Sequence, residues 1–292
     1  MKYVKPEFRK IARTLTIIEN DLEGCDDILH NLPSISGSVV LGITGPPGAG
    51  KSTLISKLIS KILKSDKRIA VLAVDPTSPF NYGSLLGDRI RMNEHFNNQN
   101  VFIRSVATRG SLGGISAKTI EMVDVLKAAG FDYVIVETVG VGQSEVEIAG
   151  LADVTVLVLV PEAGDEIQHI KAGLMEIADV FAVNKADRPG AAEFANNLKK
   201  LTTQRGCETP VIKTNSEKAE GIDELLSSIH SAQKTHTGKR KEMLLAEKAW
   251  SLIQSKKMKG IDKKKLQQEI AEALKESDFN LYRFVNDWIR NS

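Results

Sequence analysis

Five runs of almost uninterrupted apolar residues, rich in Val and Ile, mark the middle of the chain. They lack the alternation of polar and apolar positions that is typical of a strand with one solvent-exposed face, so they predict strands buried on both faces. A shorter run at residues 210–213 predicts a sixth strand. The five longer predicted strands are residues 39–44, 68–74, 133–137, 154–160 and 180–184.

Segments with apolar residues at helical spacing lie between several of these runs. They predict helices at residues 51–63, 116–129, 166–178 and 221–230. Strands that alternate with helices form parallel sheets with helices on both faces, because each crossover connection places a helix against the sheet. The predicted fold is therefore an α/β fold with a doubly wound, mostly parallel sheet.

Both ends of the chain predict helical extensions. Residues 6–30 carry apolar side chains at roughly helical spacing, and residues 34–38 form a small polar hinge. From residue 231 onward, 14 lysine and arginine residues stand against 8 acidic residues, and apolar positions again recur at helical intervals. These positions need a surface to bury against: the parent domain, a second copy in a homodimer, or a partner protein. We expect an N-terminal extension at 1–36, a main domain at 37–230 and a C-terminal arm at 231–292.

The composition argues against several classes of protein. With 292 residues, 42% of them apolar and 26% charged, the chain is typical of a folded globular protein. A net charge of only +2 argues against a dedicated nucleic-acid binder, because such proteins carry a marked basic excess. Cys25 and Cys207 lie too far apart to indicate a zinc site or a disulfide framework. No export signal or membrane-spanning run is evident, so we expect a cytoplasmic protein without a membrane partner.

The segment from Gly45 to Ser52 matches G-x-x-x-x-G-K-[ST] directly between a predicted strand and a predicted helix. Its glycines allow backbone N–H groups to point at phosphate oxygens, and the helix adds its positive N-terminus. We expect Lys51 to act in catalysis at the β- and γ-phosphates and Ser52 to offer its hydroxyl to Mg²⁺. The predicted nucleotide-binding residues of this loop are Gly45, Pro46, Pro47, Gly48, Ala49, Gly50, Lys51, Ser52 and Thr53.

Two acidic residues that end apolar runs are candidates for further metal ligands and catalytic groups. Glu137 is followed three residues later by Gly140, which is where P-loop proteins keep a metal-binding acid and a glycine that senses the γ-phosphate. Asp75 ends another predicted strand, and open α/β sheets bind ligands at the carboxyl ends of their strands. The alternative for either acid is a carboxylate that only caps a loop.

The four residues Asn184-Lys185-Ala186-Asp187 follow an apolar run, which is the setting in which N-K-x-D recognises guanine. The Asp187 carboxylate can accept hydrogen bonds from guanine N1–H and from the exocyclic amine, a pair of donors that adenine lacks. A buried carboxylate left unpaired would make adenine binding costly, so we expect GTP and GDP rather than ATP. A base-capping loop is expected after the sixth strand, at Thr214, Asn215 and Ser216.

With these motifs in this order, the chain resembles the MeaB/ArgK/MMAA family of P-loop GTPases over roughly residues 8–255. The resemblance implies a P-loop NTPase fold closer to the SIMIBI class than to Ras-like switches. It also implies a GTPase that acts as a chaperone of an adenosylcobalamin-dependent acyl-CoA mutase, most often methylmalonyl-CoA mutase, by gating cofactor loading and protecting the enzyme. Members of the family are typically homodimers.

The resemblance also assigns roles to segments outside the three motifs. It places Asp88 in a segment that approaches Mg²⁺ or the γ-phosphate, beside Asp75 and Glu137. It places Asp165 and Lys171 in a nucleotide-responsive segment that the client enzyme reads. The chain departs from the family at Asn215, where Ser-Ala is common, and in the Lys-rich stretch after Ser255.

The sequence predicts slow hydrolysis by the chain alone. The position after Gly140 is Val141, where Ras-like proteins carry a water-orienting glutamine, and the nearest glutamine is Gln143. Binding of the client is expected to complete the site. Two alternatives stay open: a metallochaperone GTPase for another metalloenzyme, although the 5 histidines are scattered, and a P-loop small-molecule kinase that uses ATP.

Overall fold

The computed structural model describes most of the chain in two compact units, Met1–Lys248 and Ala249–Ser292. The described residues are 6–33, 37–75, 92–107, 117–138, 147–161, 172–204, 209–235, 238–258, 261, 263–275 and 279–291.

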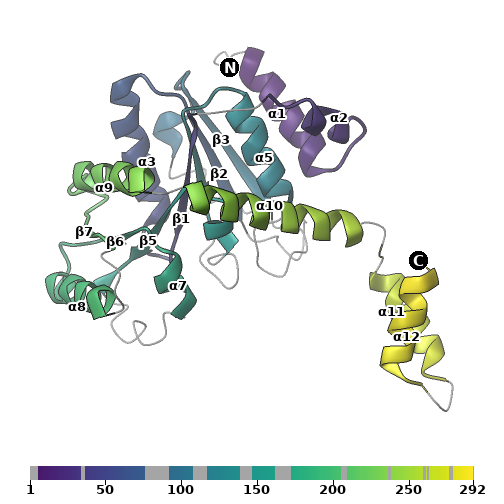
Figure 1. Ribbon diagram of the computed structural model, residues 1–292. Helices are drawn as coiled ribbons and strands as arrows, with labels where there is room; N and C mark the ends of the chain where they lie inside the picture. Colours follow the sequence, from purple (N-terminus) through teal and green to yellow (C-terminus); the bar gives the residue numbers. More distant parts are fainter. Residues whose placement is uncertain are drawn as a thin grey trace. The chain divides into compact units, whose positions relative to one another are not determined.

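The first unit contains a parallel sheet of seven strands in the order β3-β2-β4-β1-β5-β6-β7 (Figure 1). This arrangement confirms the predicted α/β class, and the six predicted strands are all present to within one or two residues at their ends. The strands are β1 (Val39–Thr44), β2 (Ile69–Asp75), β3 (Val101–Ala107), β4 (Tyr133–Glu137), β5 (Val154–Leu159), β6 (Val180–Val183) and β7 (Val211–Lys213).

The edge strand β3 was not predicted from the sequence. Its sequence, VFIRSVA, interrupts the apolar run with Arg104 and Ser105, and its middle residues are only half-buried. Because β3 is an edge strand of the sheet and β2 is its one neighbour among the described strands, it does not need the unbroken apolar run of a central strand. The Arg104 side chain is only 15% exposed, and it donates hydrogen bonds to the Ala12 carbonyl and to the Glu19 carboxylate of the N-terminal helix.

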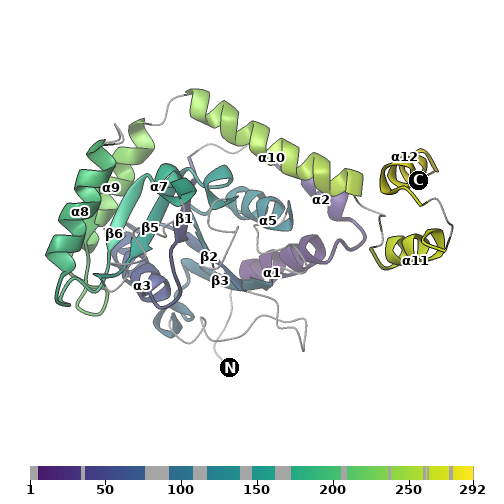
Figure 2. The ribbon, with the colours of Figure 1, turned by 90° about the horizontal axis from the view of Figure 1, so that it is seen from below.

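Helices cover both faces of the sheet (Figures 1 and 2). Successive β1 residues face opposite sides, because Val40 belongs to one core cluster and Leu41 to the other. The Leu41 face packs against α3 (Lys51–Ile62) and α9 (Ile222–Thr235). The helices of the opposite face are α1 (Pro6–Glu19), α2 (Cys25–His30), α5 (Ala117–Ala128), α7 (Ala172–Ile177) and α8 (Ala191–Gln204).

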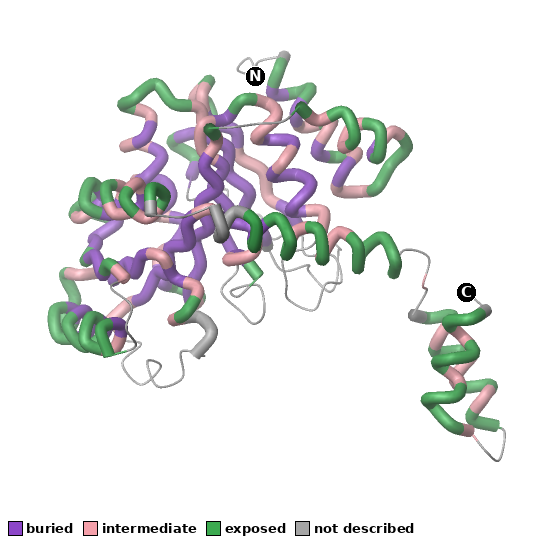
Figure 3. The backbone as a smooth tube through the Cα atoms, viewed as in Figure 1, coloured by how far each residue is buried: buried purple, intermediate pink, exposed green. Residues whose placement is uncertain are grey.

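Helix α8 was also missed, because its buried stripe consists of little more than Phe194, Ala195 and Leu198. The helical segment predicted before β1 is present as α1 and α2, and α1 buries Phe8, Leu15 and their neighbours in the same core as β3 and α5. Figure 3 shows this burial along the strands and along the inner face of α1. The helix predicted at 166–178 is described only from residue 172.

The C-terminal part of the chain is helical, as expected. Helix α10 (Gly238–Met258) leads into α11 (Lys263–Ala273) and α12 (Leu281–Asn291). In the second unit the Trp288 indole N–H donates to Glu269 at 2.6 Å, which joins α12 to α11. No described side chain of this unit is buried, and Leu281 and Ile289 are exposed. Among the described helices, none has the length and apolar character needed to cross a membrane.

Candidate functional site

The loop between β1 and α3 is shaped by glycines that no other residue can replace without strain. Gly45 has a φ of 140°, and a Cβ there would lie 2.1 Å from the Val158 carbonyl oxygen. Gly50 has a φ of 87°, and a Cβ there would lie 2.4 Å from the Asn184 amide nitrogen. Both positions therefore require glycine for backbone conformation and for close approach. The curled loop ends at the N-terminus of α3, where unpaired backbone N–H groups favour an anion.

Lys51, in the first turn of α3, extends over this loop. Its ammonium group donates to the carbonyl oxygens of Gly45 and Pro46 at 2.8 and 3.1 Å, and the side chain is almost completely buried. The positive charge is thus held inside the loop, next to the N–H groups of the helix. This is the position from which a lysine can contact the terminal phosphates of a nucleotide.

The next residue, Ser52, contacts the acid at the end of β4. The Ser52 hydroxyl donates to Glu137 Oε1 at 2.7 Å, and both side chains are buried. The register explains this contact, because Glu137 pairs with Ile43 on β1, just before the loop. A buried hydroxyl beside a carboxylate is a set of hard oxygen ligands of the kind that Mg²⁺ prefers, so the residues present fit the ion.

Asp75 lies at the same edge of the sheet. Its strand β2 pairs with β4 so that Ala73 is opposite Glu137, which places the Asp75 backbone two residues further toward the carboxyl end. Asp75 and Glu137 therefore end neighbouring strands at the same edge of the sheet, and a role for either acid in metal binding or catalysis stays a prediction.

A pair of hydroxyl groups beneath the loop was missed from the sequence. The Thr138 hydroxyl donates to the Thr44 hydroxyl at 2.9 Å, and both are buried. Together with the hydrogen bond from the Thr138 N–H to the Ile43 carbonyl, it joins the end of β4 to the end of β1. The signal in the sequence was a threonine directly after each of two apolar runs, facing the same edge.

Asn184 connects three segments that are far apart in the sequence. Its amide nitrogen donates to the Ala49 carbonyl of the loop at 2.8 Å. Its amide oxygen accepts hydrogen bonds from the Thr214 hydroxyl at 3.2 Å and from the Ser216 N–H and hydroxyl at 3.1 and 2.8 Å. All four of these residues are buried. The amide of Asn184 therefore fixes the loop, the end of β6 and the segment after β7 relative to one another.

A cleft of about 290 Å³ opens where these three segments meet. Asp187 is exposed at this cleft, and among the described residues its carboxylate has no hydrogen-bond or ion-pair partner. Lys185 has a φ of 55°, and its ammonium group donates to the Gly48 carbonyl at 2.8 Å, so its aliphatic chain passes beside the cleft. The lining residues are Gly48, Gly50, Thr53, Asn184, Lys185, Asp187, Arg188, Asn215, Ser216 and Glu217.

The Asn215 side chain lines the cleft and also shapes the segment after β7. The Asn215 side-chain oxygen accepts from the N–H groups of Glu217 and Lys218 at 3.1 and 3.2 Å, which closes a turn over the segment after β7. Four other predicted site residues, Asp88, Gly140, Asp165 and Lys171, lie outside the described residues. The side chain of Asp75 is also outside them.

Substitution of Asn184 by alanine is expected to destabilise the fold as well as the site. It leaves the Ala49 carbonyl and the Ser216 N–H buried without these partners, which costs about 2 to 3 kcal/mol in the free energy of unfolding. Urea unfolding followed by circular dichroism measures this loss. The control is Asn31→Ala, which removes an exposed local hydrogen bond to Asp27 and is expected to cost less than about 0.5 kcal/mol. Equal losses in the two variants would contradict the role given to Asn184.

Comparisons with known proteins agree with this geometry. The model of the family described as "Methylmalonyl Co-A mutase-associated GTPase MeaB" matches residues 11–269. A relative from Pyrococcus horikoshii is 45% identical over 281 residues, which cover 92% of this chain and 87% of the relative. The mouse protein named methylmalonic aciduria type A homolog, mitochondrial, is 40% identical over 201 residues, which cover 66% of this chain and 48% of the mouse protein.

A solved structure shares the fold over the whole chain. The crystal structure of an LAO/AO transport system kinase has a TM-score of 0.69 with this protein at 23% sequence identity. The match covers 99% of this chain and 100% of the other. At this level of identity the likeness concerns the fold alone.

Proposed function

Because the chain belongs to the MeaB family of methylmalonyl-CoA mutase-associated GTPases, we propose that it is a GTP-hydrolysing chaperone of an adenosylcobalamin-dependent acyl-CoA mutase. In this role it gates cofactor loading and protects the enzyme, and methylmalonyl-CoA mutase is the proposed client. The observation that carries the proposal is the cleft in which the glycine-rich loop, Asn184–Asp187 and the segment after β7 meet.

The cleft supports guanine as the base. The exposed Asp187 carboxylate is available to accept hydrogen bonds from N1–H and the exocyclic amine of guanine at the rim. Lys185, held by the Gly48 carbonyl, lines the cleft with its aliphatic chain, which can cover one face of the base. Asn184 contributes by holding the loop and the segment after β7 at the correct separation.

The phosphates are proposed to lie over the loop and the N-terminus of α3. Lys51 and the helix N–H groups supply positive charge where negative charge develops during phosphoryl transfer. Ser52 and Glu137 would hold Mg²⁺, with Asp75 and Asp88 as further proposed ligands or catalytic groups. The bound ion supplies charge neutralisation at the β- and γ-phosphates. With nucleotide bound, the Lys51 ammonium exchanges loop carbonyls for phosphate oxygens.

Hydrolysis is proposed to be slow in the chain alone and faster with the client bound. The position after Gly140 is Val141, which cannot orient a water molecule by hydrogen bonding. We assign the missing contribution to the segments holding Asp75, Asp88 and Lys171, which complete the site when the client binds. Completion of a site by a partner accelerates other GTPases by large factors.

The same proposal includes a homodimer in the cytoplasm, with an N-terminal extension at 1–36, a GTPase domain at 37–230 and a C-terminal arm at 231–292. Support for a covered surface on the arm comes from its exposed apolar side chains, among them Leu274, Leu281 and Ile289. Apolar side chains at helical spacing on an exposed face favour association.

Cofactor loading tests the proposed function. Apo-methylmalonyl-CoA mutase from the same organism is mixed with the purified chain and adenosylcobalamin, with GTP or with GDP, and cofactor uptake is followed by absorbance. We expect uptake to differ between the two nucleotides and to differ from uptake without the chain. Identical uptake in all three mixtures would contradict the chaperone role.

A further inference from the structure

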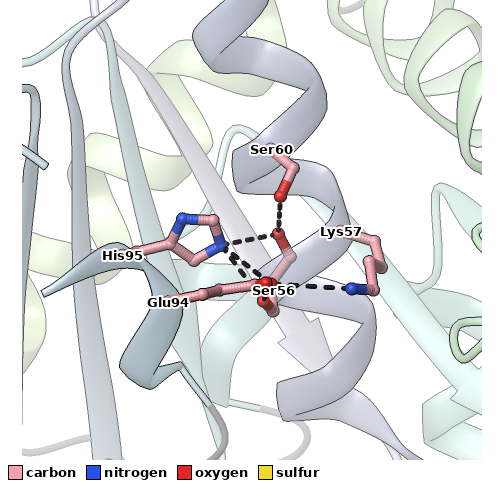
Figure 4. A network of polar contacts seen from close by, with 5 residues as sticks. All are labelled: Ser56, Lys57, Ser60, Glu94 and His95. Atoms are coloured by element: carbon pink, nitrogen blue, oxygen red, sulfur yellow. Dashed lines mark hydrogen bonds and ion pairs between the residues drawn. The ribbon is translucent and has the colours of Figure 1, made fainter.

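A polar cluster between α3 and the segment before β3 lies one helical turn after Ser52, and none of the motifs above includes it. It consists of Ser56, Glu94 and His95, and we refer to it as the Ser56 cluster (Figure 4). Ser56 is on α3, whereas Glu94 and His95 belong to the short 3₁₀ helix η2 (Asn93–His95). Ser56 and His95 are only 2% and 5% exposed, whereas the Glu94 side chain is 52% exposed.

Both oxygen atoms of Ser56, the hydroxyl and the carbonyl, take part in the hydrogen bonds of the cluster. The Ser56 hydroxyl donates to Glu94 Oε1, which also lies 3.6 Å from the Lys57 ammonium. His95 Nε2 lies 3.0 Å from the Ser56 carbonyl oxygen and 3.1 Å from its hydroxyl oxygen. The Ser60 hydroxyl donates to the same carbonyl at 3.1 Å. The hydrogen bond from Ser56 lowers the pKa of the Glu94 carboxyl, so this group is an acceptor at neutral pH.

These contacts determine which nitrogen of His95 carries a proton. The single hydroxyl proton of Ser56 is directed to Glu94, and the Ser56 carbonyl can only accept. Nε2 must therefore be the donor, and its N–H is shared between the two Ser56 oxygens. This tautomer assignment follows from the hydrogen-bond network.

The residue that precedes the 3₁₀ helix η2 anchors it in the apolar core. Met92 directly precedes it, is fully buried, and belongs to the same apolar core as Leu58 and Ile59 of α3. Glu94 and His95 are therefore presented to α3 from a packed part of the core.

Apolar packing and hydrogen bonds constrain a helix in different ways. The apolar side chains of α3 hold it against the sheet, but the hydrophobic effect itself is non-directional. Hydrogen bonds to fixed groups are directional and specify the rotation and the axial position. The Ser56 cluster supplies such bonds four residues after Ser52, whose hydroxyl lies 2.7 Å from Glu137 Oε1.

We propose that His95 and Glu94 are positioning residues for the magnesium-binding end of α3, acting through Ser56. The inference rests on the proposed binding of a guanine nucleotide with Mg²⁺ at Ser52 and Glu137. It predicts that loss of the His95 donor weakens the binding of nucleotide more in the presence of Mg²⁺ than in its absence.

Release of a fluorescent GDP analogue, measured by stopped flow in Mg²⁺ and in EDTA, tests this role. His95→Leu is expected to raise the release rate in Mg²⁺ by about fivefold, which corresponds to the loss of one buried hydrogen bond. In EDTA its release rate is expected to rise by a clearly smaller factor, because Ser52 and Glu137 then hold no ion. His95→Gln places an amide N–H near the position of Nε2 and is expected to restore slow release. Ser56→Ala removes only the hydroxyl group, and it is expected to raise the release rate in Mg²⁺ as His95→Leu does.

The matched control is His230→Leu. His230 Nε2 makes a partly buried hydrogen bond of 2.8 Å to the Tyr133 hydroxyl, at the start of β4 and therefore at the opposite end of the strands from the loop. This variant is expected to lose stability without any change in the magnesium dependence of release.

Two outcomes would overturn the positioning role: equal magnesium dependence in His95→Leu and the wild type, or the same change in His230→Leu. Failure of the wild type to bind GDP would instead contradict the proposed function itself.

Discussion

Replacement of Lys51 by alanine is expected to lower GTP turnover by about 100- to 1,000-fold, the effect of removing one preorganised charge from a phosphoryl-transfer site. Lys51 is held in the loop by the carbonyl oxygens of Gly45 and Pro46, so its ammonium group is in place before the nucleotide arrives. Alanine removes this ammonium group from the place proposed for the β- and γ-phosphates. Steady-state phosphate release measures the loss, and fluorescent GDP binding shows that the site is still formed.

The matched control for this prediction is Lys61→Ala. Lys61 lies on the same helix and forms a partly exposed ion pair with Asp223 of α9. Exposed ion pairs contribute little, so turnover by this variant is expected to equal that of the wild type. Retention of most of the turnover by Lys51→Ala, or an equal loss in Lys61→Ala, would contradict the role given to Lys51.

Replacement of Asp187 by asparagine is expected to change the preferred base from guanine to xanthine. The asparagine oxygen still accepts from N1–H, but its NH₂ group now faces the exocyclic amine of guanine, donor against donor. Xanthine carries a carbonyl at that position and accepts from the NH₂ group. We expect affinity for GDP to fall by about 100-fold or more and affinity for xanthosine diphosphate to rise, as measured by competition with fluorescent GDP.

Folding should be unaffected by this change, because the Asp187 side chain is exposed at the cleft. Asp223→Asn, the same chemical change on the exposed surface of α9, is the control and is expected to keep the preference for guanine. An Asp187→Asn variant that still prefers GDP over xanthosine diphosphate would show that another group reads the base.

The parts of the fold that the sequence predicted are those with a strong apolar pattern. Central strands such as β1 and β5 are buried on both faces and carry unbroken apolar runs, so their ends were predicted to within one residue. The edge strand β3 and the helix α8 carry weaker patterns, because part of each faces solvent. In β3 the apolar run is interrupted by Arg104 and Ser105, and in α8 few apolar side chains are buried, so neither pattern stands out in the sequence.

Some features of the site could be predicted from the sequence and others could not. Lys51, Ser52, Glu137 and Asp187 belong to short motifs whose spacing reflects local geometry, and the fold places them around one edge of the sheet. The hydrogen bonds of Asn184 to Ala49 and Ser216 could not be predicted, because they join segments that meet only through the order of the strands. The contact between His95 and Ser56 depends likewise on packing between distant segments.

The measurement that tests the account most directly is turnover of GTP and of ATP by the purified chain, alone and with methylmalonyl-CoA mutase from the same organism. We expect slow turnover of GTP alone, faster turnover of GTP with the mutase, and negligible turnover of ATP in both cases. Turnover of ATP at the rate of GTP would contradict the base assignment and favour a kinase. Tight GTP binding with turnover that the mutase leaves unchanged would contradict the proposed client and favour a GTPase that serves another metalloenzyme.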